Sequence, residues 1–306
     1  MPLMQKAVTP AVSAAILEHG YDRVSGFVLR AEDVGFATTA ELLFEAHGLG
    51  FPGSPFRADA PSVDLLRFPT SGQLRFEDAV GGTDDASRRS TGGPFLDRPP
   101  FTGLGFQAVH GEVVPQFWLM HTRVPAGTEL VRVHADGTTT ALARFTDVGH
   151  GWQPEGGDAV PGPALSRFVG LMARWRGEYL AADVLADGGI VVASEVEPEP
   201  VLDGFTVTPG GRWSREVPRD EVTELFELVV TATWDGLPVR VVDQWTGEDD
   251  EPVARVSYTG HDADLAESHS LEKLDAAVYE ATVPMSALRA VTPGQLVPDE
   301  WAATTA

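Results

Sequence analysis

A short tryptophan motif that occurs twice in the second half of the chain constrains the fold more than any other feature. Residues 173–177 read A-R-W-R-G and residues 232–236 read A-T-W-D-G. The two tryptophans lie 59 residues apart, a spacing typical of a duplicated small unit. Each copy continues with an Asp and then with an aromatic residue four positions before Val-Pro; these are Asp183 and Trp213 in the first copy and Asp243 and Tyr279 in the second.

This repeat predicts the domain organisation of a chain that is α+β and β-rich. With 306 residues, of which 43% are apolar, the chain is long enough for more than one packed core. The predicted parts are an N-terminal α+β domain at residues 1–155, two tandem small β-rich modules at residues 165–228 and 229–292, and a mobile tail at residues 293–306.

Each module is expected to be a small curved sheet with one short helix. In the second module, strands are predicted on both sides of the Asp235-Gly236 turn, and a helical turn is predicted at 261–269. A helical run at 220–227 is expected to join the modules. The aromatic residues that recur at equivalent positions of the two copies should anchor the core of each module, because a unit of about 60 residues needs a few large apolar contacts.

The N-terminal part shows signals for both helices and strands. Residues 10–20 and 38–48 each combine a Thr cap, an apolar face and a terminal Gly, which predicts two short helices. An Asp-Gly pair predicts the turn of a hairpin between strands near 128–133 and 139–145. A Gly/Pro-rich linker is expected at 149–163.

Residues 79–100 look like the most flexible stretch of the chain. A long loop of this kind is usually functional or disordered. Its arginines, Arg88, Arg89 and Arg98, suggest two interpretations. The favoured interpretation is a mobile surface loop with solvated arginines, and the alternative is an anion-binding role.

The charge of the chain is uneven. Residues 1–150 carry 17 acidic and 12 basic side chains, a net charge of −5, whereas residues 151–306 carry 28 and 10, a net charge of −18. Such a field repels nucleic-acid phosphates and anionic membrane surfaces and attracts basic proteins. The alternative interpretation is an acidic surface that only confers solubility.

The sequence excludes several classes of site and compartment signal. It contains no cysteine, which rules out disulfides, thiolate nucleophiles and Cys-ligated metals. A secretory signal and an apolar run long enough to span a membrane are both lacking, so the expected location is the cytoplasm. No metal-binding, nucleophile-elbow, phosphate-loop or dinucleotide motif is complete, and we expect no cofactor or metal.

One enzymatic hypothesis rests on a family resemblance. Residues 125–132, P-A-G-T-E-L-V-R, resemble the first strand of ADP-ribosyltransferases and related NAD-cleaving toxins, in which an arginine on that strand holds an NAD phosphate. The resemblance implies Arg132 as the phosphate ligand and Glu195 or Glu197 near the ribose. The Ser-Thr-Ser strand of that family is absent here, where Ser166 stands alone.

A second resemblance concerns genomic context. The segments T-A-E-L-L at 39–43, G-S-P-F at 53–56 and P-A-G-T-E-L at 125–130 are similar to uncharacterised actinobacterial proteins associated with type VII secretion and polymorphic-toxin regions. Those proteins have no assigned catalytic residues. The resemblance implies a setting in which acidic proteins bind basic toxins or secreted substrates.

The main functional hypothesis is a non-enzymatic, acidic protein-interaction module that docks a basic protein partner, as an immunity factor or a secretion-linked adaptor. The acidic run Asp249, Asp250 and Glu251 and the nearby Trp245 are the expected partner-binding residues. Trp245 and Trp301 would anchor a partner only if they lie on the surface. Core packing is the favoured interpretation for Trp245.

Overall fold

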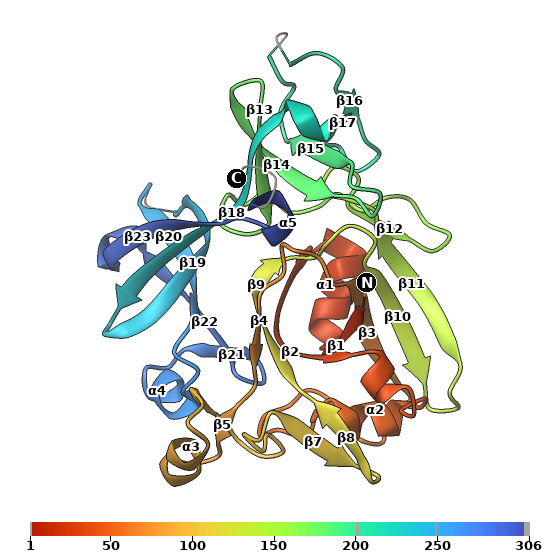
Figure 1. Ribbon diagram of the computed structural model, residues 1–306, viewed down its shortest axis with the longest axis vertical. Coiled ribbons are helices and arrows are strands. Elements are labelled where there is room, and N and C mark those ends of the chain that lie inside the picture. The colour runs from red at the N-terminus through yellow and green to blue at the C-terminus, as the bar shows by residue number, and fades with distance from the viewer. Residues whose placement is uncertain (1, 200–201, 249, 303–306) are drawn as a thin grey trace.

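The structure is a computed structural model that describes residues 2–199, 202–248 and 250–302. It is β-rich with few helices, 14% helical and 46% strand, and the strands form several sheets. Figure 1 shows the N-terminal part at the lower right and the repeat half as two lobes, one at the top and one at the left.

An eight-stranded antiparallel sheet forms the N-terminal part, in the order β12-β11-β10-β3-β1-β2-β9-β4. The predicted hairpin at Asp136-Gly137 is present and joins β10 to β11. The strands are β1 (Leu3–Val8), β2 (Arg23–Arg30), β3 (Ser62–Pro69), β4 (Phe76–Asp78), β9 (Phe117–Arg123), β10 (Glu129–His134), β11 (Thr139–Phe145) and β12 (Trp152–Pro154).

The strand β12 corrects the prediction of a linker at 149–163. Trp152 is completely buried, and its indole nitrogen donates to the carbonyl of Tyr21 at 2.8 Å. The Gly and Pro residues around it had suggested an open connection. The apolar ring instead holds three of these residues in the sheet, because burying so large a side chain outweighs the weak strand propensity of its neighbours.

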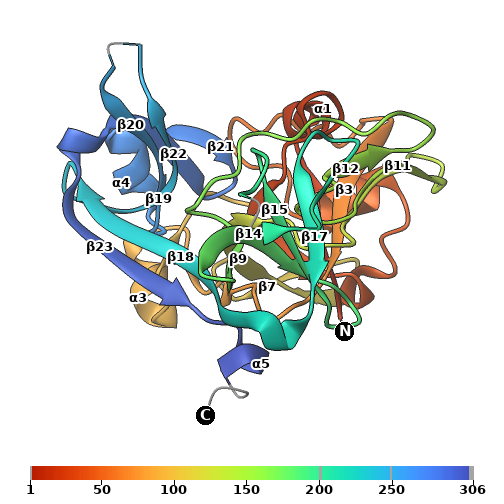
Figure 2. The same ribbon diagram turned by 90° about the horizontal axis from the view of Figure 1, so that it is seen from above.

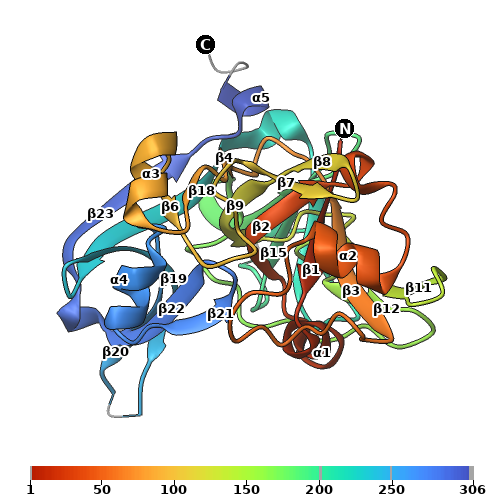
Figure 3. The same ribbon diagram turned by 90° about the horizontal axis from the view of Figure 1, so that it is seen from below.

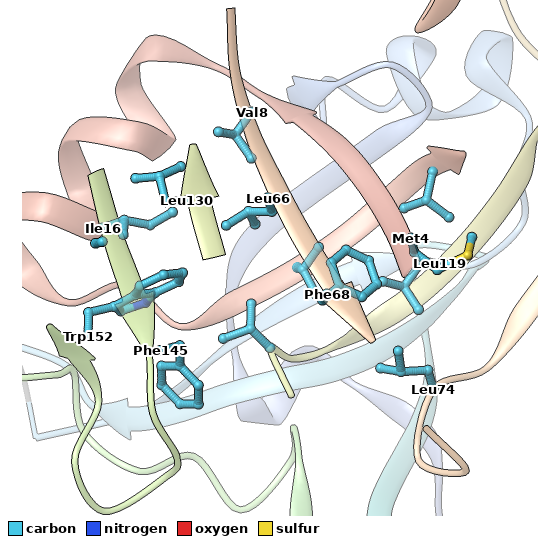
Figure 4. Packing of buried hydrophobic residues seen from close by; sticks show 14 residues of the cluster. Met4, Val8, Ile16, Leu66, Phe68, Leu74, Leu119, Leu130, Phe145 and Trp152 are labelled. Atoms are coloured by element: carbon cyan, nitrogen blue, oxygen red, sulfur yellow. The ribbon is translucent and has the colours of Figure 1, made fainter. Parts of the chain in front are cut away.

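The two faces of this sheet carry separate helices, because successive side chains of a strand point to opposite faces. On one face, α1 (Pro10–His19) packs on a core that contains Val8, Phe68 and Phe145, shown in Figure 4. On the other face, the 3-10 helix η1 (Glu32–Val34) and α2 (Ala40–Ala46) cover a second core. The helices α1 and α2 begin at the predicted threonine caps, Thr9 and Thr39 respectively.

Residues 79–100 are more regular than predicted. They form β5 (Gly81–Gly82), α3 (Asp85–Thr91) and β6 (Phe95–Leu96), and the hairpin β7 (Phe106–Val109) and β8 (Glu112–Pro115) follows. Asp84 caps α3 by accepting from the backbone nitrogen of Ser87.

The prediction of solvated arginines in this segment is wrong for two of the three. Arg88 donates to Asp262 at 2.6 Å, and Arg98 contacts Asp264 at 2.6 Å and Glu267 at 2.8 Å. These acids lie more than 160 residues further along the chain, so local sequence gives no sign of them. Arg89 is exposed, as expected.

The repeat half forms one continuous antiparallel sheet in the order β16-β17-β15-β14-β13-β18-β19-β20-β22-β21, with β23 paired to β18. Its short helices are η3 (Arg219–Glu221), α4 (Ala263–Ser268), η4 (Met285–Ala287) and α5 (Asp299–Ala302). The strands are β13 (Leu171–Trp175), β14 (Glu178–Val184), β15 (Ile190–Ser194), β16 (Thr206–Val207), β17 (Trp213–Val217), β18 (Val222–Trp234), β19 (Leu237–Thr246), β20 (Pro252–Tyr258), β21 (Glu272–Asp275), β22 (Val278–Pro284) and β23 (Arg289–Leu296).

The long strand β18 belongs to both copies of the repeat. Its first half pairs with β13 and its second half with β19, while β23 lies along its other edge. The helical run predicted at 220–227 is therefore wrong, because most of it is strand. The boundary placed between 228 and 229 falls inside β18, and residues 293–296 of the predicted tail belong to β23.

The main strands and the 3-10 helix after them follow the same order in both copies, although the second copy also contains α4. In the first unit (171–227), β13, β14, β15 and β17 lead through η3 into β18. In the second unit (228–296), β18, β19, β20 and β22 lead through η4 into β23.

Each tryptophan motif ends the first strand of its unit. A two-residue turn follows in which both residues have positive φ: Arg176 at 51° with Gly177 at 92°, and Asp235 at 48° with Gly236 at 82°. This turn type matches the twist of paired strands, which explains why the glycine recurs. Trp175 is fully buried, whereas Trp234 is half-buried.

Candidate interaction surface

The hairpin between β19 and β20 extends away from the rest of the molecule, as Figure 2 shows at the upper left. Trp245 lies near its end, opposite Val253, and is 42% exposed. The interpretation of Trp245 as a core residue is therefore wrong. The strand pair continues outward past the body of its sheet, so the indole ring has too few neighbours to be buried.

The turn of this hairpin is acidic. Glu248, Asp250 and Glu251 are exposed, and none of them makes an ion pair with any residue that the structure describes. The backbone nitrogen of Gly247 donates to the carbonyl of Glu251 at 2.8 Å, which closes the turn. Asp249, the remaining predicted partner-binding residue, lies outside the described residues.

Trp301 does not contribute to a surface of this kind. It is 7% exposed and packs in the core of the first unit. The guanidinium of Arg219 lies 5.0 Å from the centre of its ring.

Many other acids of the repeat half are already paired with the N-terminal part. Arg88 and Arg98 bind acids in and next to α4, as described above. Both lysines of the chain also cross between the two halves: Lys6 contacts Asp275 at 2.6 Å, and Lys273 lies 3.8 Å from Asp97. Part of the −18 charge of the second half is thus neutralised within the molecule. Composition alone does not reveal which of the acids are paired in this way.

The recurring Asp of the repeat takes part in this pairing. Arg23 and Arg123 face each other across β2 and β9. Arg23 donates to Asp243 at 2.8 Å, and Arg123 lies 3.6 Å from Asp183. Each arginine also donates to the carbonyl of the residue before its Asp, at 3.4 Å and 2.7 Å respectively. The repeated Asp is therefore a docking residue for the N-terminal sheet, a role whose only sequence signal was its recurrence.

A buried ion pair lies where β18 passes from one unit to the other. Arg240 donates to Glu227 at 2.8 Å, and both side chains are at most 3% exposed. Arg240 also donates to the carbonyl of His121 at 2.6 Å, and Thr122 donates to Glu227 at 3.2 Å. Because a buried charge is stable only when it is paired and hydrogen-bonded, this network ties both units to β9.

Burial perturbs the ionisation of Asp183. Its complete burial raises the pKa to about 7, while the positive charge of Arg123 partly opposes this shift and Asp147 adds to it. A carboxyl group whose pKa is raised by burial makes the free energy of unfolding depend on pH, and such a shift does not require a catalytic role.

The residues of the enzymatic hypothesis lie in different settings. Arg132 donates to both carboxylate oxygens of Asp64, at 2.7 and 2.8 Å, and lines a cleft of about 410 Å³ that contains neither Glu195 nor Glu197. Glu195 accepts from the backbone nitrogen of Leu165 at 2.7 Å. Glu197 is exposed.

Among the described residues, no helix is long and apolar enough to cross a membrane, and no three or more His, Asp or Glu side chains are grouped to hold a metal ion. Comparison with known protein families, with curated proteins and with solved structures finds no match.

Proposed function

We propose that this protein is an acidic protein-interaction module that docks a basic protein partner through the β19–β20 hairpin. In the setting implied by its sequence resemblance, the partner is a basic toxin or secreted substrate, and the protein is an immunity factor or a secretion-linked adaptor in the cytoplasm. The observation that carries the proposal is the exposed Trp245 beside an acidic turn.

The apolar part of this surface supplies affinity. Tryptophan is enriched among the few residues that dominate binding energy at interfaces, because its large ring buries much apolar area when a partner covers it. Trp245 stands on a paired strand and not on an irregular loop. Little conformational entropy would therefore be lost when it is covered.

The acidic turn supplies attraction and selectivity. Exposed charges of one sign that lack internal partners raise the rate of encounter with an oppositely charged protein and disfavour partners of like charge. Glu248, Asp250 and Glu251 differ in this respect from Asp243 and Asp275, which already hold cations of the N-terminal part. The hairpin is thus a better docking site than the acidic half taken as a whole.

The NAD-handling alternative has less support from the contacts of its residues. The guanidinium of Arg132 is occupied by Asp64, and the backbone of Leu165 occupies one oxygen of Glu195. Nicotinamide release from NAD by the purified protein, abolished by Arg132→Ala, would reverse this preference.

A pull-down from extract of the native cells tests the proposal. The wild-type protein should retain a basic protein at low salt and release most of it at raised salt, since salt screens exposed charges. The double variant Asp250→Asn, Glu251→Gln should retain much less. A matched variant in the first unit, Glu197→Gln with Glu199→Gln, removes the same charge and should bind like the wild type.

Two outcomes of that pull-down count against the proposal. One is retention of no basic protein. The other is retention that both double variants reduce equally, because this would assign the effect to overall charge and not to the hairpin.

A further inference from the structure

A cavity of about 320 Å³ lies on the face of the N-terminal sheet that η1 and α2 cover. Strands β1, β3 and β10 contribute Gln5, Arg67 and Val133 to its lining. Residues in and around η1 and at the turn from β10 to β11 complete it: Ala31, Val34, Gly35, Ala37, Thr38, Gly137 and Thr139. None of the lining residues is an Asp or a Glu. In a chain with a net charge of −23, a cavity that holds a cation and no acid is a distinct electrostatic environment.

Arg67 has an unusual position among the arginines of the chain. It makes no hydrogen bond or ion pair with any residue that the structure describes, and its Nε atom is buried without a partner. Only exposed arginines share this lack of polar partners in the described ranges: Arg30, Arg89, Arg144 and Arg167. Arg67 is half-buried, so water replaces the missing partners less well than it does for the others.

One of the two cross-strand neighbours of Arg67 is an acid, but it does not form an ion pair with Arg67. Glu129 lies directly across from Arg67 in β10, but no ion pair joins the two side chains within 4.0 Å. On the other side, the cross-strand neighbour in β1 is Gln5, whose amide nitrogen lies 3.1 Å from Nε2 of His47. Neither cross-strand neighbour therefore accepts a hydrogen bond from the guanidinium of Arg67.

His47 gives independent support for a positive field beside this cavity. Burial, together with the positive charges of Lys6 and Arg67, lowers the pKa of His47 to about 3. The imidazole is consequently neutral at physiological pH, and Arg67 is the one charged side chain among the residues that line the cavity. A positive charge that is partly shielded from water interacts more strongly with an anion than a fully exposed charge does.

We propose that the Arg67 cavity binds a small oxyanion, a carboxylate or a phosphate, through the guanidinium of Arg67. The planar fork of donors on arginine fits two oxygens of either group, and such charge-assisted bonds are about twice as strong as neutral ones. Thr38 and Thr139, which also line the cavity, carry hydroxyl donors for a third oxygen. The volume lies at the lower end of the range for ligand pockets, which suits a metabolite-sized ligand.

Titration of the full chain with sodium acetate and, separately, with inorganic phosphate at constant ionic strength tests the site. The readouts are calorimetry and the NMR resonance of the Arg67 Nε–H group. The wild type should bind one of the probes saturably and shift that resonance. Arg67→Gln should weaken binding at least about tenfold, whereas Arg144→Gln, an exposed arginine of the same sheet, should bind normally.

Each outcome has one meaning. Binding of acetate alone assigns a carboxylate ligand, and binding of phosphate alone assigns a phosphate ligand. If Arg67→Gln does not fold, Arg67→Lys and the wild-type resonance shift still report on the site. Absence of saturable binding up to about 50 mM of both probes, or equal binding by Arg67→Gln, overturns the proposal.

Discussion

Single buried charges have the clearest consequences at the residue scale. Asp183 recurs in the sequence as Asp243, yet the two carboxyls differ in environment: Asp183 is 1% exposed, whereas the side chain of Asp243 is 32% exposed. Burial raises the pKa of Asp183 to about 7. A repeat in sequence therefore preserves the position of a residue but not its degree of burial.

The pH dependence of stability should report on Asp183. Its pKa is about 7 in the folded protein and near 3.9 in an unfolded chain. The folded protein thus keeps a proton that the unfolded chain has released, so this group makes the free energy of unfolding fall as pH rises from about 4 to about 7. Asp183→Asn should remove that component of the slope.

Urea denaturation at several pH values measures this effect. The variant Asp187→Asn changes an exposed Asp of the same unit and should keep the wild-type slope. A slope that is the same in Asp183→Asn and in the wild type would show that Asp183 titrates normally.

At the scale of elements, the turn of the β19–β20 hairpin should contribute little to the stability of the fold. Its turn is exposed and makes no ion pair with the described parts of the chain. Replacing residues 247–251 by a two-residue Asn-Gly turn should therefore change the free energy of unfolding by less than about 1 kcal/mol, because surface changes away from packed contacts have small effects. Thermal unfolding followed by circular dichroism measures the change, and a loss above about 2 kcal/mol would mean that the turn supports the fold.

Local sequence predicted the elements whose structure is set locally. The Asp235-Gly236 turn and the alternation on both sides of it specified the hairpin of β18 and β19, and threonine caps specified α1 and α2. The prediction of a helix at 220–227 failed because the run D-E-V-T-E-L-F-E fits a helical face as well as a strand. Its strand form is fixed by β13, which lies about 50 residues away.

The candidate surface was only partly predictable. The acidic run at 249–251 is visible in the sequence, but the exposure of Trp245 depends on how far its hairpin extends past the sheet. The pairing of Arg88 and Arg98 with acids of the second unit was not predictable from local sequence either, because the partners lie far apart along the chain. No sequence signal distinguished Arg67 from the other arginines, because its lack of a partner is a property of the folded chain.

At the scale of the whole molecule, buried cations hold the N-terminal sheet and the repeat half together. Figure 3, from below, shows β9 and β18 in the middle of the molecule, where these contacts lie. Arg23 and Arg123 each bind a carboxylate and a backbone carbonyl across this seam. Arg240 pairs with Glu227 inside the repeat half, and it crosses the seam through its hydrogen bond to the carbonyl of His121. We therefore expect the two halves to depend on each other for stability.

Removing one partner of the central pair should be strongly destabilising. Arg240→Ala would leave Glu227 buried without its cation, which typically costs about 3–5 kcal/mol. Arg144→Ala, on the exposed side of β11, should change stability by about 0.5 kcal/mol or less. Chemical denaturation compares the two variants, and a loss below about 1 kcal/mol for Arg240→Ala would deny this pair a central role.

The central claim is that a basic partner binds at the β19–β20 hairpin, and site-specific photo-crosslinking in the native cells tests it most directly. A photoreactive residue is placed at Thr246, beside Trp245, or at Thr206, another exposed Thr on a strand of the first unit. The account predicts a covalent adduct with a basic protein from position 246 and little or none from position 206. Adducts of equal yield from both positions, or no adduct from position 246, would contradict it.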